Sequence, residues 1–454
     1  MFTQLFFDDQ RLLGREGLAR AYAQPTLVSE YRDPEFSTDF PALSAIETAD
    51  GKIRLLYHGR RADGAEGTFL AVSDDGLHFA PESTRAALPL EGRVADHQVF
   101  VTAPGMEVAA VVEDRFCAAD ERYKLLFTAV DSERVAVDGF VYASSDLIHF
   151  HKIEGEMWNG GAEPVTGVFY NAHKRCYTII RRPGWGDRRV GHSDTADFRS
   201  FTPFELCLQA DALDEPLDEL YGMNVMPYAG MYIGFPLLYT NNHSNREVKY
   251  KSGNIYPQLA YSFDGHHFMR SLRASYLKEY SGQPGMFWLS GLLPRKNGET
   301  LMYVVKAGGE HGSGFWHSTG GVISIYRARK DGFIALKTEG GAEGLLTTRE
   351  NLWLGGELSV NLTADFATCA VIDETQNALD GFDHADCAPF RGDCDAWQPR
   401  FRGGSLNNLK GKALIFEIRL KNGCLYSVSG DMKPLTYQQG RRYRRLGIAP
   451  ESME

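Results

Sequence analysis

The sequence predicts an all-β protein, in which a five-bladed β-propeller is followed by a C-terminal antiparallel β-sandwich. Three observations support this fold class: a repeated hairpin pattern, short strands at regular spacing, and almost no helical periodicity. The hairpin pattern is a short apolar strand, a turn rich in Ser, Asp and Gly, and an aromatic residue. It occurs at 70–79, 141–150, 190–201 and 259–268, with a weaker fifth copy at 321–333.

Two further strands precede each hairpin. The middle strands read KIRLLYHG, RYKLLFTAV, CYTIIRRP, GMYIGFPLLY and TLMYVVKA. The first strands of the five units are expected at 40–44, 97–101, 164–168, 222–226 and 286–289. Radial arrangement of such units leaves only short, protected sheet edges, and the first strands then line a central channel. One large sandwich with turns that match by chance is the alternative, and four matching hairpins weigh against it.

The blade pattern stops near residue 334, so we expect a propeller domain at 1–333 and a sandwich domain at 334–454. Strands beyond this boundary are longer and are separated by polar turns, as in an antiparallel sandwich. A chain of 454 residues is long enough for two domains. An opening strand around Leu5, Phe6 and Phe7 is a candidate for closing the ring against the last blade.

Composition and charge exclude several classes of function and partner. The net charge of -11 argues against a nucleic-acid partner, because phosphate binding needs a basic face. No apolar stretch is long enough to span a bilayer, so we expect no membrane association. Seven scattered cysteines and a start without a secretory pattern predict a cytoplasmic protein. No nucleotide-binding or zinc-protease motif occurs, so we expect no cofactor and no metal, and leave a homo-oligomer open.

Acidic residues before the first strands are the candidate catalytic groups. In a propeller the starting ends of the innermost strands meet at one mouth of the channel, so residues far apart in sequence converge there. Asp39, Asp96 and Glu163 precede the expected first strands of the first three units. Crowded carboxyls have pKa values that are pushed apart, as acid–base cleavage of a glycosidic bond requires. Each of them alone would be interpreted as a turn residue.

A sugar site also needs aromatic platforms and hydrogen-bond donors. The residues expected to bind substrate near the same mouth are His97, Arg182, Glu219, Tyr221, Trp288 and His317. Further candidates are Trp158, Tyr170, Arg181, Trp185, Asn224, His311 and Trp316. For most residues of both groups, core packing or loop structure is the commoner role. A glycine-rich loop at 308–321 is expected to cover the pocket.

The order Asp, Asp, Glu over three units resembles glycoside hydrolase families 32 and 68. The runs LFFDDQRLL, ERYKLLFTA, ELYGMNVMPYAGMYIG and RKDGFIAL, followed by GGELSVNL, RGDC and FRGG, are similar to bacterial proteins with a family-32-like N-terminal region. This resemblance covers essentially the whole chain and implies a five-bladed propeller with a C-terminal sandwich. It also implies that Asp39 is the nucleophile, Asp96 the transition-state stabiliser and Glu163 the general acid/base.

The sequence departs from the family pattern at each motif. Ser37-Thr38-Asp39-Phe40-Pro41 stands in place of Trp-Met-Asn-Asp-Pro-Asn-Gly, Ala95-Asp96-His97 in place of Arg-Asp-Pro, and Glu163-Pro164 in place of Glu-Cys. An Arg32-Asp33-Pro34 tripeptide does occur, but before the first unit, which makes Asp33 a fallback candidate only.

The sequence therefore predicts a glycoside hydrolase that cleaves a small glycoside or oligosaccharide, with a fructoside or arabinoside as the expected furanoside substrate. A retaining mechanism needs carboxyls about 5 Å apart and an inverting one about 6.5–9.5 Å, so the stereochemistry stays open. Related family-43 propellers invert with an acid on another blade, which makes Glu219 a second candidate acid. The alternatives are a non-catalytic sugar-binding propeller and a glycoside phosphorylase, for which Arg181, Arg182, Arg188 and Arg189 would bind phosphate.

Overall fold

The computed structural model is almost entirely β-structure, which confirms the all-β class, and it divides into two compact units. The larger unit is Gln24–Ala328, and the smaller unit combines Met1–Ala23 with Arg329–Glu454. This division differs from the expected one at 333/334, because the first 23 residues belong with the C-terminal part of the chain. The structure describes residues 1–38, 43–85, 92–100, 106–131, 136–155, 165–241, 253–277, 285–307, 309–311 and 321–447.

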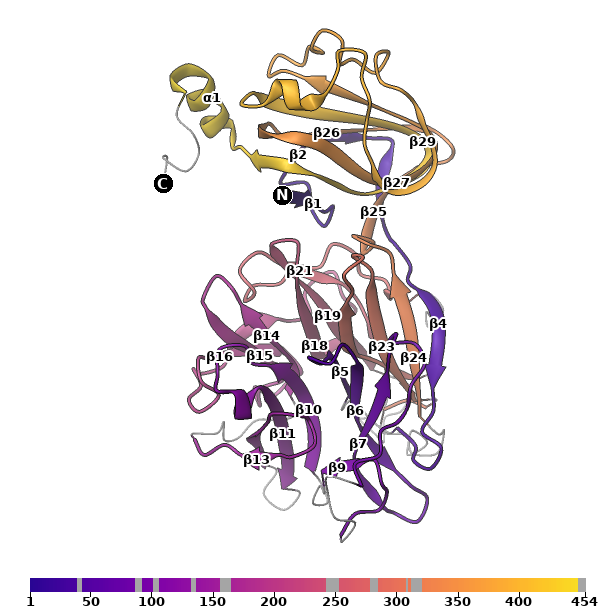
Figure 1. Ribbon diagram of the computed structural model, residues 1–454, viewed down its shortest axis with the longest axis vertical. Helices are drawn as coiled ribbons and strands as arrows, with labels where there is room; N and C mark the ends of the chain where they lie inside the picture. Colours follow the sequence, from indigo (N-terminus) through magenta and orange to yellow (C-terminus); the bar gives the residue numbers. More distant parts are fainter. Residues whose placement is uncertain are drawn as a thin grey trace. The chain divides into compact units, whose positions relative to one another are not determined.

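The larger unit consists, in its described residues, of five sets of antiparallel strands (Figure 1). The first set is β5 (Leu43–Glu47), β6 (Ile53–Arg60), β7 (Glu66–Ser73) and β8 (Ala80–Pro81), with β9 (Gln98–Phe100) also paired to β7. The second is β10 (Met106–Glu113), β11 (Tyr123–Asp131), β12 (Ala136–Ser144) and β13 (His151–Lys152), with the short 3-10 helix η1 (Ala119–Glu121) before β11. The third is β14 (Val165–Asn171), β15 (Cys176–Arg181), β16 (Val190–Thr195) and β17 (Glu205–Leu208).

The last two sets form one continuous sheet. The fourth set is β18 (Glu219–Tyr228), β19 (Met231–Asn241), β20 (Gly253–Pro257) and β21 (Ala260–Ser262). The fifth is β22 (Met286–Pro294), β23 (Thr300–Ala307), β24 (Val322–Ala328) and β4 (Thr26–Tyr31). A single parallel bridge between Ile255 and Met286 joins them.

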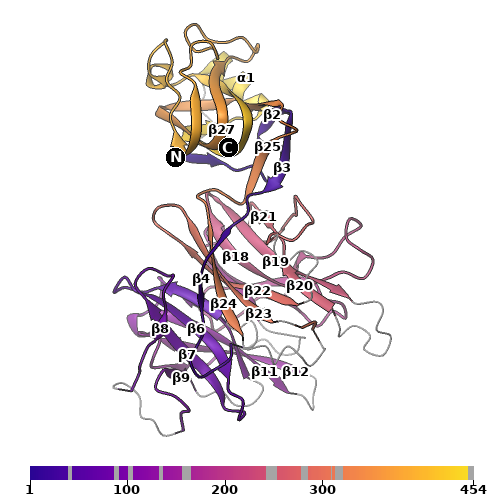
Figure 2. The ribbon, with the colours of Figure 1, turned by 90° about the vertical axis from the view of Figure 1, so that its right-hand side faces the viewer.

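The first strands of the five sets form a closed ring. Strand β5 contacts β10, and the contacts continue through β14, β18 and β22 back to β5. Strand β4, from the start of the unit, pairs with β24 and supplies the outer strand of the fifth set (Figure 2). The expected closing strand at Leu5, Phe6 and Phe7 is therefore wrong, since these buried residues belong to the smaller unit.

Local hydrogen bonds explain the repeated hairpin. In the first copy, the Ser73 hydroxyl accepts from the Gly76 backbone N–H at 2.9 Å, and the Asp75 carboxylate accepts from Leu77 and His78. Gly76 has a φ of 80°, a conformation that glycine adopts without strain. The same Ser or Thr hydroxyl bond recurs at Ser144, Thr195 and Ser262, which aligns the four copies residue by residue.

The second strand set begins later in the chain than the sequence pattern predicted. The segment expected as its first strand, 97–101, contains β9, and β9 pairs with β7 of the first set. The first strand of the second set is β10. Both segments alternate like strands, so the sequence pattern identified β-structure correctly but assigned the wrong neighbour.

The smaller unit is built on one antiparallel sheet that folds back on itself. Its long strands β27 (Asn351–Ile372) and β29 (Ala413–Pro434) pair along their length, and Asn351 pairs with both Pro434 and Leu414, near opposite ends of β29. The sheet thereby encloses a core that includes Phe6, Trp353 and Phe416. The remaining strands are β1 (Phe2–Gln4), β2 (Leu12–Glu16), β3 (Leu18–Tyr22), β25 (Ile334–Thr338), β26 (Glu343–Thr348) and β28 (Phe390–Trp397).

Helical structure is sparse in this unit. The 3-10 helix η5 (Leu406–Leu409) lies before β29, and α1 (Tyr437–Leu446) follows it. A capping box between Thr436 and Gln439 starts α1, and Gly447 ends it at a φ of 65°. In the part of the chain that the structure describes, no helix combines the length and apolar character needed to cross a membrane.

Candidate functional site

A cavity of about 1130 Å³ is lined by all five first strands. Strands β5 and β14 line it along most of their length, beginning with Ser44 and Thr166, and β10, β18 and β22 line it with their later residues, beginning with Ala110, Asn224 and Ser290. The lining continues into the residues that follow β5, β10 and β22, and it reaches Tyr170 and Pro227 near the ends of β14 and β18, so the five strands run in the same direction and end here. Their starting ends, where the sequence places the candidate catalytic residues, therefore lie at the opposite end of the ring.

Small polar side chains join neighbouring first strands beside this cavity. The Ser44 hydroxyl accepts from the Val111 N–H at 2.9 Å, which links β5 to β10. The Thr166 hydroxyl accepts from the Met223 N–H at 3.0 Å and donates to the Met223 carbonyl at 3.1 Å. Asn224 Nδ2 donates to the carbonyl of Ser290, linking β18 to β22. The candidate Asn224 thus holds the ring together away from the predicted mouth.

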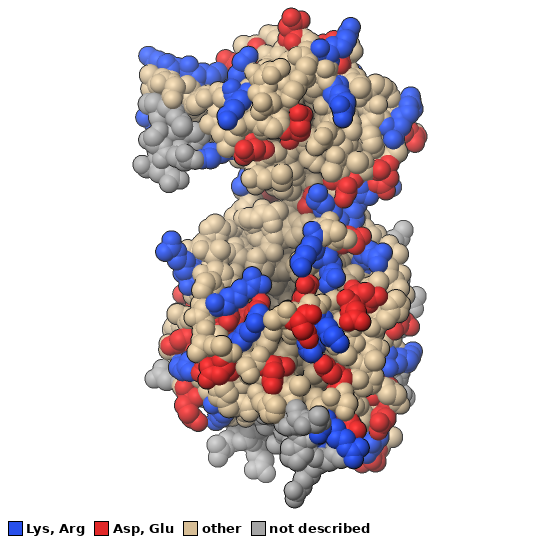
Figure 3. Space-filling view, in the orientation of Figure 1, with Lys and Arg blue, Asp and Glu red and all other residues tan. Residues whose placement is uncertain are grey.

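Acidic and basic side chains are interspersed over the larger unit on the face that Figure 3 shows. At the cavity itself, Glu113 binds Arg122 and Arg115. Burial opposes ionisation of Glu113, but these guanidinium groups lower its pKa. The candidate Tyr170 also lies at this end, where its ring packs 4.7 Å from that of Phe116, so it is remote from the strand starts.

At the starting ends of β18 and β22 a group of side chains packs together, which we call the arginine–aromatic cluster. It comprises Arg182, Arg188, Glu219, Tyr221, Tyr239, Trp288 and His311. Four of the six predicted substrate-binding residues are in it: Arg182, Glu219, Tyr221 and Trp288.

Tyr221 is the centre of this cluster. The Arg182 guanidinium carbon lies 4.6 Å from the centre of the Tyr221 ring, and the Trp288 ring meets it edge-on at 4.9 Å. The Tyr221 hydroxyl is 3.2 Å from Nε2 of His311. Tyr221 sits at a β-bulge between Leu220 and Gly222, which turns its side chain relative to the regular strand. Tyr221 and Trp288 are buried, so they pack within the cluster and are not an open platform.

Arg188 organises the charged side of the cluster. Its Nη1 is 2.6 Å from Glu219 Oε2, and its backbone N–H donates to Glu219 Oε1 at 3.1 Å. The guanidinium also lies 4.6 Å from the ring centre of Tyr239. Burial raises the pKa of Tyr239 to about 12; Arg188 opposes this shift, and the carboxylates of Glu219 and Glu310 add to it. Glu310 is therefore an acidic neighbour that the sequence reasoning missed, although it had singled out the 308–321 loop.

Between Arg182 and Arg188 the loop carries Trp185, an exposed aromatic side chain. Arg189 pairs with Asp187 at 2.7 Å, and the Arg181 guanidinium is buried 5.4 Å from the ring centre of Phe204. Arg181 is thus a packing residue and not a ligand-binding one.

Three predicted site residues fall outside the described residues: Asp39, Glu163 and His317. The further candidates Trp158 and Trp316 do so as well. In the sequence, Asp39 precedes β5 by four residues and Glu163 precedes β14 by two. Their predicted roles stay predictions.

Asp96 does not lie with the first strands. It immediately precedes the segment that pairs as β9 with β7, three strand positions from β5, which corresponds to about 14 Å at the usual strand spacing. Its half-exposed carboxylate is 3.9 Å from Arg85. The predicted convergence of Asp96 with the strand starts is therefore corrected, because the strand that follows it belongs to the outer edge of the first set.

His97 and the fallback residue Asp33 form a buried pair, with His97 Nε2 at 2.8 Å from Asp33 Oδ2. Asp33 also accepts from the Tyr57 hydroxyl and from the backbone N–H groups of Glu35 and Phe36. Burial opposes ionisation of Asp33, but the hydrogen bonds from His97 and Tyr57 lower its pKa. Its side chain is 0% exposed. Both residues therefore stabilise the turn before β5 and do not face a substrate.

No family model matches the chain, and no curated protein matches it. Solved structures with a similar outline include a thermostable family-43 glycoside hydrolase, 11% identical over 68% of this chain and 96% of that chain, with a TM-score of 0.43. They also include a β-fructofuranosidase from Schwanniomyces occidentalis, 9% identical over 90% and 97%, with a TM-score of 0.42. A β-1,2-mannobiose phosphorylase from Listeria innocua is 13% identical over 69% and 97%, also with a TM-score of 0.42.

Proposed function

We propose that the five strand sets of Gln24–Ala328 are the blades of a propeller and that the protein is a glycoside hydrolase. The observation that supports this best is the closed ring of first strands, which all run in one direction. In such a ring β5 and β14 begin at the same end at which the arginine–aromatic cluster lies. In the sequence, Asp39 precedes β5 by four residues and Glu163 precedes β14 by two.

The proposed chemistry uses two carboxyls and the cluster. Glu163 is the general acid, and Asp39 is the nucleophile or the base that activates water. Tyr221 and Trp288 pack within the cluster, and the exposed Trp185 is the aromatic surface against which a sugar ring stacks. Glu219, held by two hydrogen bonds from Arg188, is proposed to accept from a sugar hydroxyl instead of donating the proton. Asp96 has no part in this proposal.

The substrate class follows from the sequence resemblance: a small furanoside, either a fructoside or an arabinoside. A panel of aryl and natural furanosides and pyranosides, followed by anomer-resolved NMR, identifies the substrate and the stereochemical outcome. On the best substrate, Glu163→Gln is expected to lower kcat by about 10²–10⁴-fold, as loss of a general acid does. Asp39→Asn is expected to lower turnover comparably.

Asp96→Asn is the matched control, because its half-exposed carboxylate lies at the outer edge of the first set. It should leave turnover unchanged. Full activity of both Asp39→Asn and Glu163→Gln would show that the hydrolase proposal is incorrect and would favour a sugar-binding protein.

A glycoside phosphorylase is less well supported. Of the four arginines considered for phosphate, Arg188 and Arg189 are paired with carboxylates and Arg181 is buried against Phe204. A phosphorylase needs cationic groups available to the anion. Measuring turnover with and without inorganic phosphate distinguishes the two enzymes, and the hydrolase proposal expects no dependence.

A further inference from the structure

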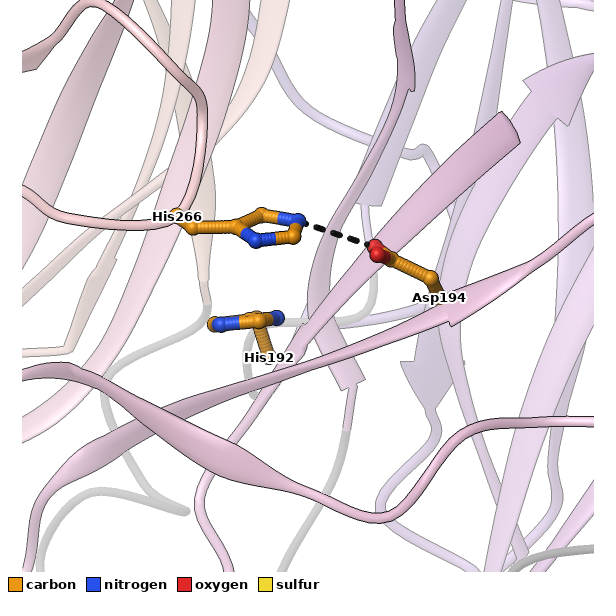
Figure 4. A group of neighbouring side chains, drawn as sticks. All are labelled: His192, Asp194 and His266. Carbon is orange, nitrogen blue, oxygen red and sulfur yellow. Dashed lines mark hydrogen bonds and ion pairs between the residues drawn. The ribbon is translucent and has the colours of Figure 1, made fainter. Parts of the chain in front are cut away.

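Three polar side chains meet between the third and fourth strand sets, away from the arginine–aromatic cluster. His192 and Asp194 are on β16, and His266 lies in the turn that follows β21 (Figure 4). The two imidazole rings stack with centroids 3.8 Å apart and planes inclined by 23°. His266 Nε2 is 3.1 Å from Asp194 Oδ1. One ligand atom from each residue lies within 4.8 Å of the others. We call these residues the two-histidine cluster.

The two histidines of the cluster are buried, Asp194 is partly exposed, and the hydrogen bonding is incomplete. His192 and His266 are each 4% exposed. Among the described residues, Nδ1 of His192 has no hydrogen-bond partner. Burial, with a smaller contribution from the neighbouring His266, lowers the pKa of His192 to about 4. A buried imidazole nitrogen without a hydrogen-bond partner among the described residues is a candidate ligand for a metal ion.

The other hairpin copies carry apolar residues at most of the equivalent positions. The shared Ser or Thr hydroxyl bond aligns the four copies. The residues equivalent to His192 are Leu70, Val141 and Leu259, and those equivalent to Asp194 are Val72, Ala143 and Tyr261. The position of His266 is held by Leu77, Ile148 and Arg199 in the other three copies. Buried polar groups are costly where apolar ones suffice, so a ligand is the simplest reason for this trio.

The surroundings of Asp194 are those of an oriented ligand. The Thr178 hydroxyl donates to Asp194 Oδ1 at 2.7 Å, and the Asp194 backbone N–H donates to the Thr202 hydroxyl at 2.9 Å. Such outer hydrogen bonds fix the direction of a metal-binding carboxylate. Lys174 Nζ, 3.9 Å from Asp194 Oδ2, is the competing cation, and its side chain is half-exposed and able to turn into solvent.

We propose that His192, Asp194 and His266 bind a divalent transition-metal ion, with Zn²⁺ as the best match, which ties the third strand set to the fourth. Two imidazole nitrogens and one carboxylate oxygen are a donor set typical of Zn²⁺, and water completes the coordination. For Nε2 of His266 to bind the ion, the single proton of the neutral ring is carried on Nδ1, and the ion takes the place of the hydrogen bond between His266 Nε2 and Asp194 Oδ1. The site is independent of the proposed glycosidase chemistry.

The test is calorimetric titration of the chelator-treated full-length protein with Zn²⁺, with Co²⁺ absorption as a readout of nitrogen and oxygen ligation. One equivalent is expected to bind to the wild-type protein. The double variant His192→Leu/His266→Leu places the residues of the first hairpin copy at both positions, so it is expected to fold. It should bind at least about 100-fold more weakly and show no ligand-field bands.

Two matched variants sharpen the result. His267 is the next residue along the chain and its exposed ring pairs with Asp264 at 2.7 Å, so His267→Leu should bind Zn²⁺ like the wild type. Thr178→Val should weaken binding about 10-fold by freeing the carboxylate. Added Zn²⁺ should raise the Tm of the wild type and of His267→Leu, but not of the double variant. Equal Zn²⁺ affinity in wild type and double variant, or no binding to the wild type, would overturn the proposal.

Discussion

In the described part of the larger unit, the buried imidazoles of His97 and His266 each contact an aspartate, and the surroundings of the two contacts differ. Asp33 accepts hydrogen bonds from His97, from the Tyr57 hydroxyl and from two backbone N–H groups, so its polar atoms are satisfied by the protein itself. Asp194 contacts His266, but the adjacent His192 keeps a ring nitrogen without a partner among the described residues. A buried polar group whose hydrogen bonds are all made within the protein indicates a structural role. A buried nitrogen without a hydrogen-bond partner indicates a binding site for a ligand.

Removal of Asp33 should have the largest effect on stability. Asp33→Ala leaves His97, the Tyr57 hydroxyl and two backbone amides without their acceptor in a fully buried site. We expect the free energy of unfolding of the larger unit to fall by about 3–5 kcal/mol, as for a buried pair that loses one partner. Thermal and urea unfolding measure this. Asp96→Ala is the control and should change stability by less than about 0.5 kcal/mol; equal effects of the two substitutions would contradict a structural role for Asp33.

The two-histidine cluster should give the next largest effect, as a dependence of stability on pH. The pKa of His192 is about 4 in the folded protein against 6.5 for an unperturbed histidine. Between these values the unfolded chain binds more protons than the folded one, so stability is constant above about pH 6.5 and falls as the pH drops toward about 4. His192→Leu should remove this part of the decrease. Unfolding in chelator at several pH values tests it, and an unchanged slope in the variant would refute it.

The exposed histidine–aspartate pairs of the hairpins should have the smallest effect. His78 and Asp75 are 2.8 Å apart, and His149 pairs with Asp146 at the same distance. Because both partners are in solvent, His78→Ala should change the free energy of unfolding by less than about 0.5 kcal/mol. Urea unfolding measures this change. If His78→Ala lowered the free energy of unfolding as much as Asp33→Ala, burial would not explain the difference between the exposed and the buried histidine–aspartate pairs.

Much of the larger unit could be predicted because its hairpin turns are stabilised by hydrogen bonds between residues close together in the sequence. The Ser, Asp and Gly turn bonds span two or three residues, so four hairpins were recognisable from the sequence. The first strand of the second strand set was assigned to the wrong segment, because residues 97–101 and 106–113 both show the alternation of apolar and polar residues that is typical of a strand. Alternation shows that a segment is a strand but not which strand it pairs with, and Asp96 was misplaced for that reason.

The candidate site was predicted in part. Arg182, Glu219, Tyr221 and Trp288 were expected near one mouth, and the structure brings them into one cluster. His97 is buried against Asp33, which depends on a contact across 64 residues. The two-histidine cluster was missed because His266 belongs to a different repeat from His192 and Asp194, and no spacing rule connects them.

Near-neighbour effects, the turn hydrogen bonds and the alternation of apolar residues, were enough to predict the β-structure, the positions of the hairpin turns and the residues able to carry chemistry. Long-range pairing was needed to show that the first 23 residues complete the smaller unit, that β9 belongs to the first set, and that His266 reaches Asp194. Each of these depends on pairing between segments distant in the chain, which is decided by burial and by the satisfaction of backbone hydrogen bonds over the whole fold.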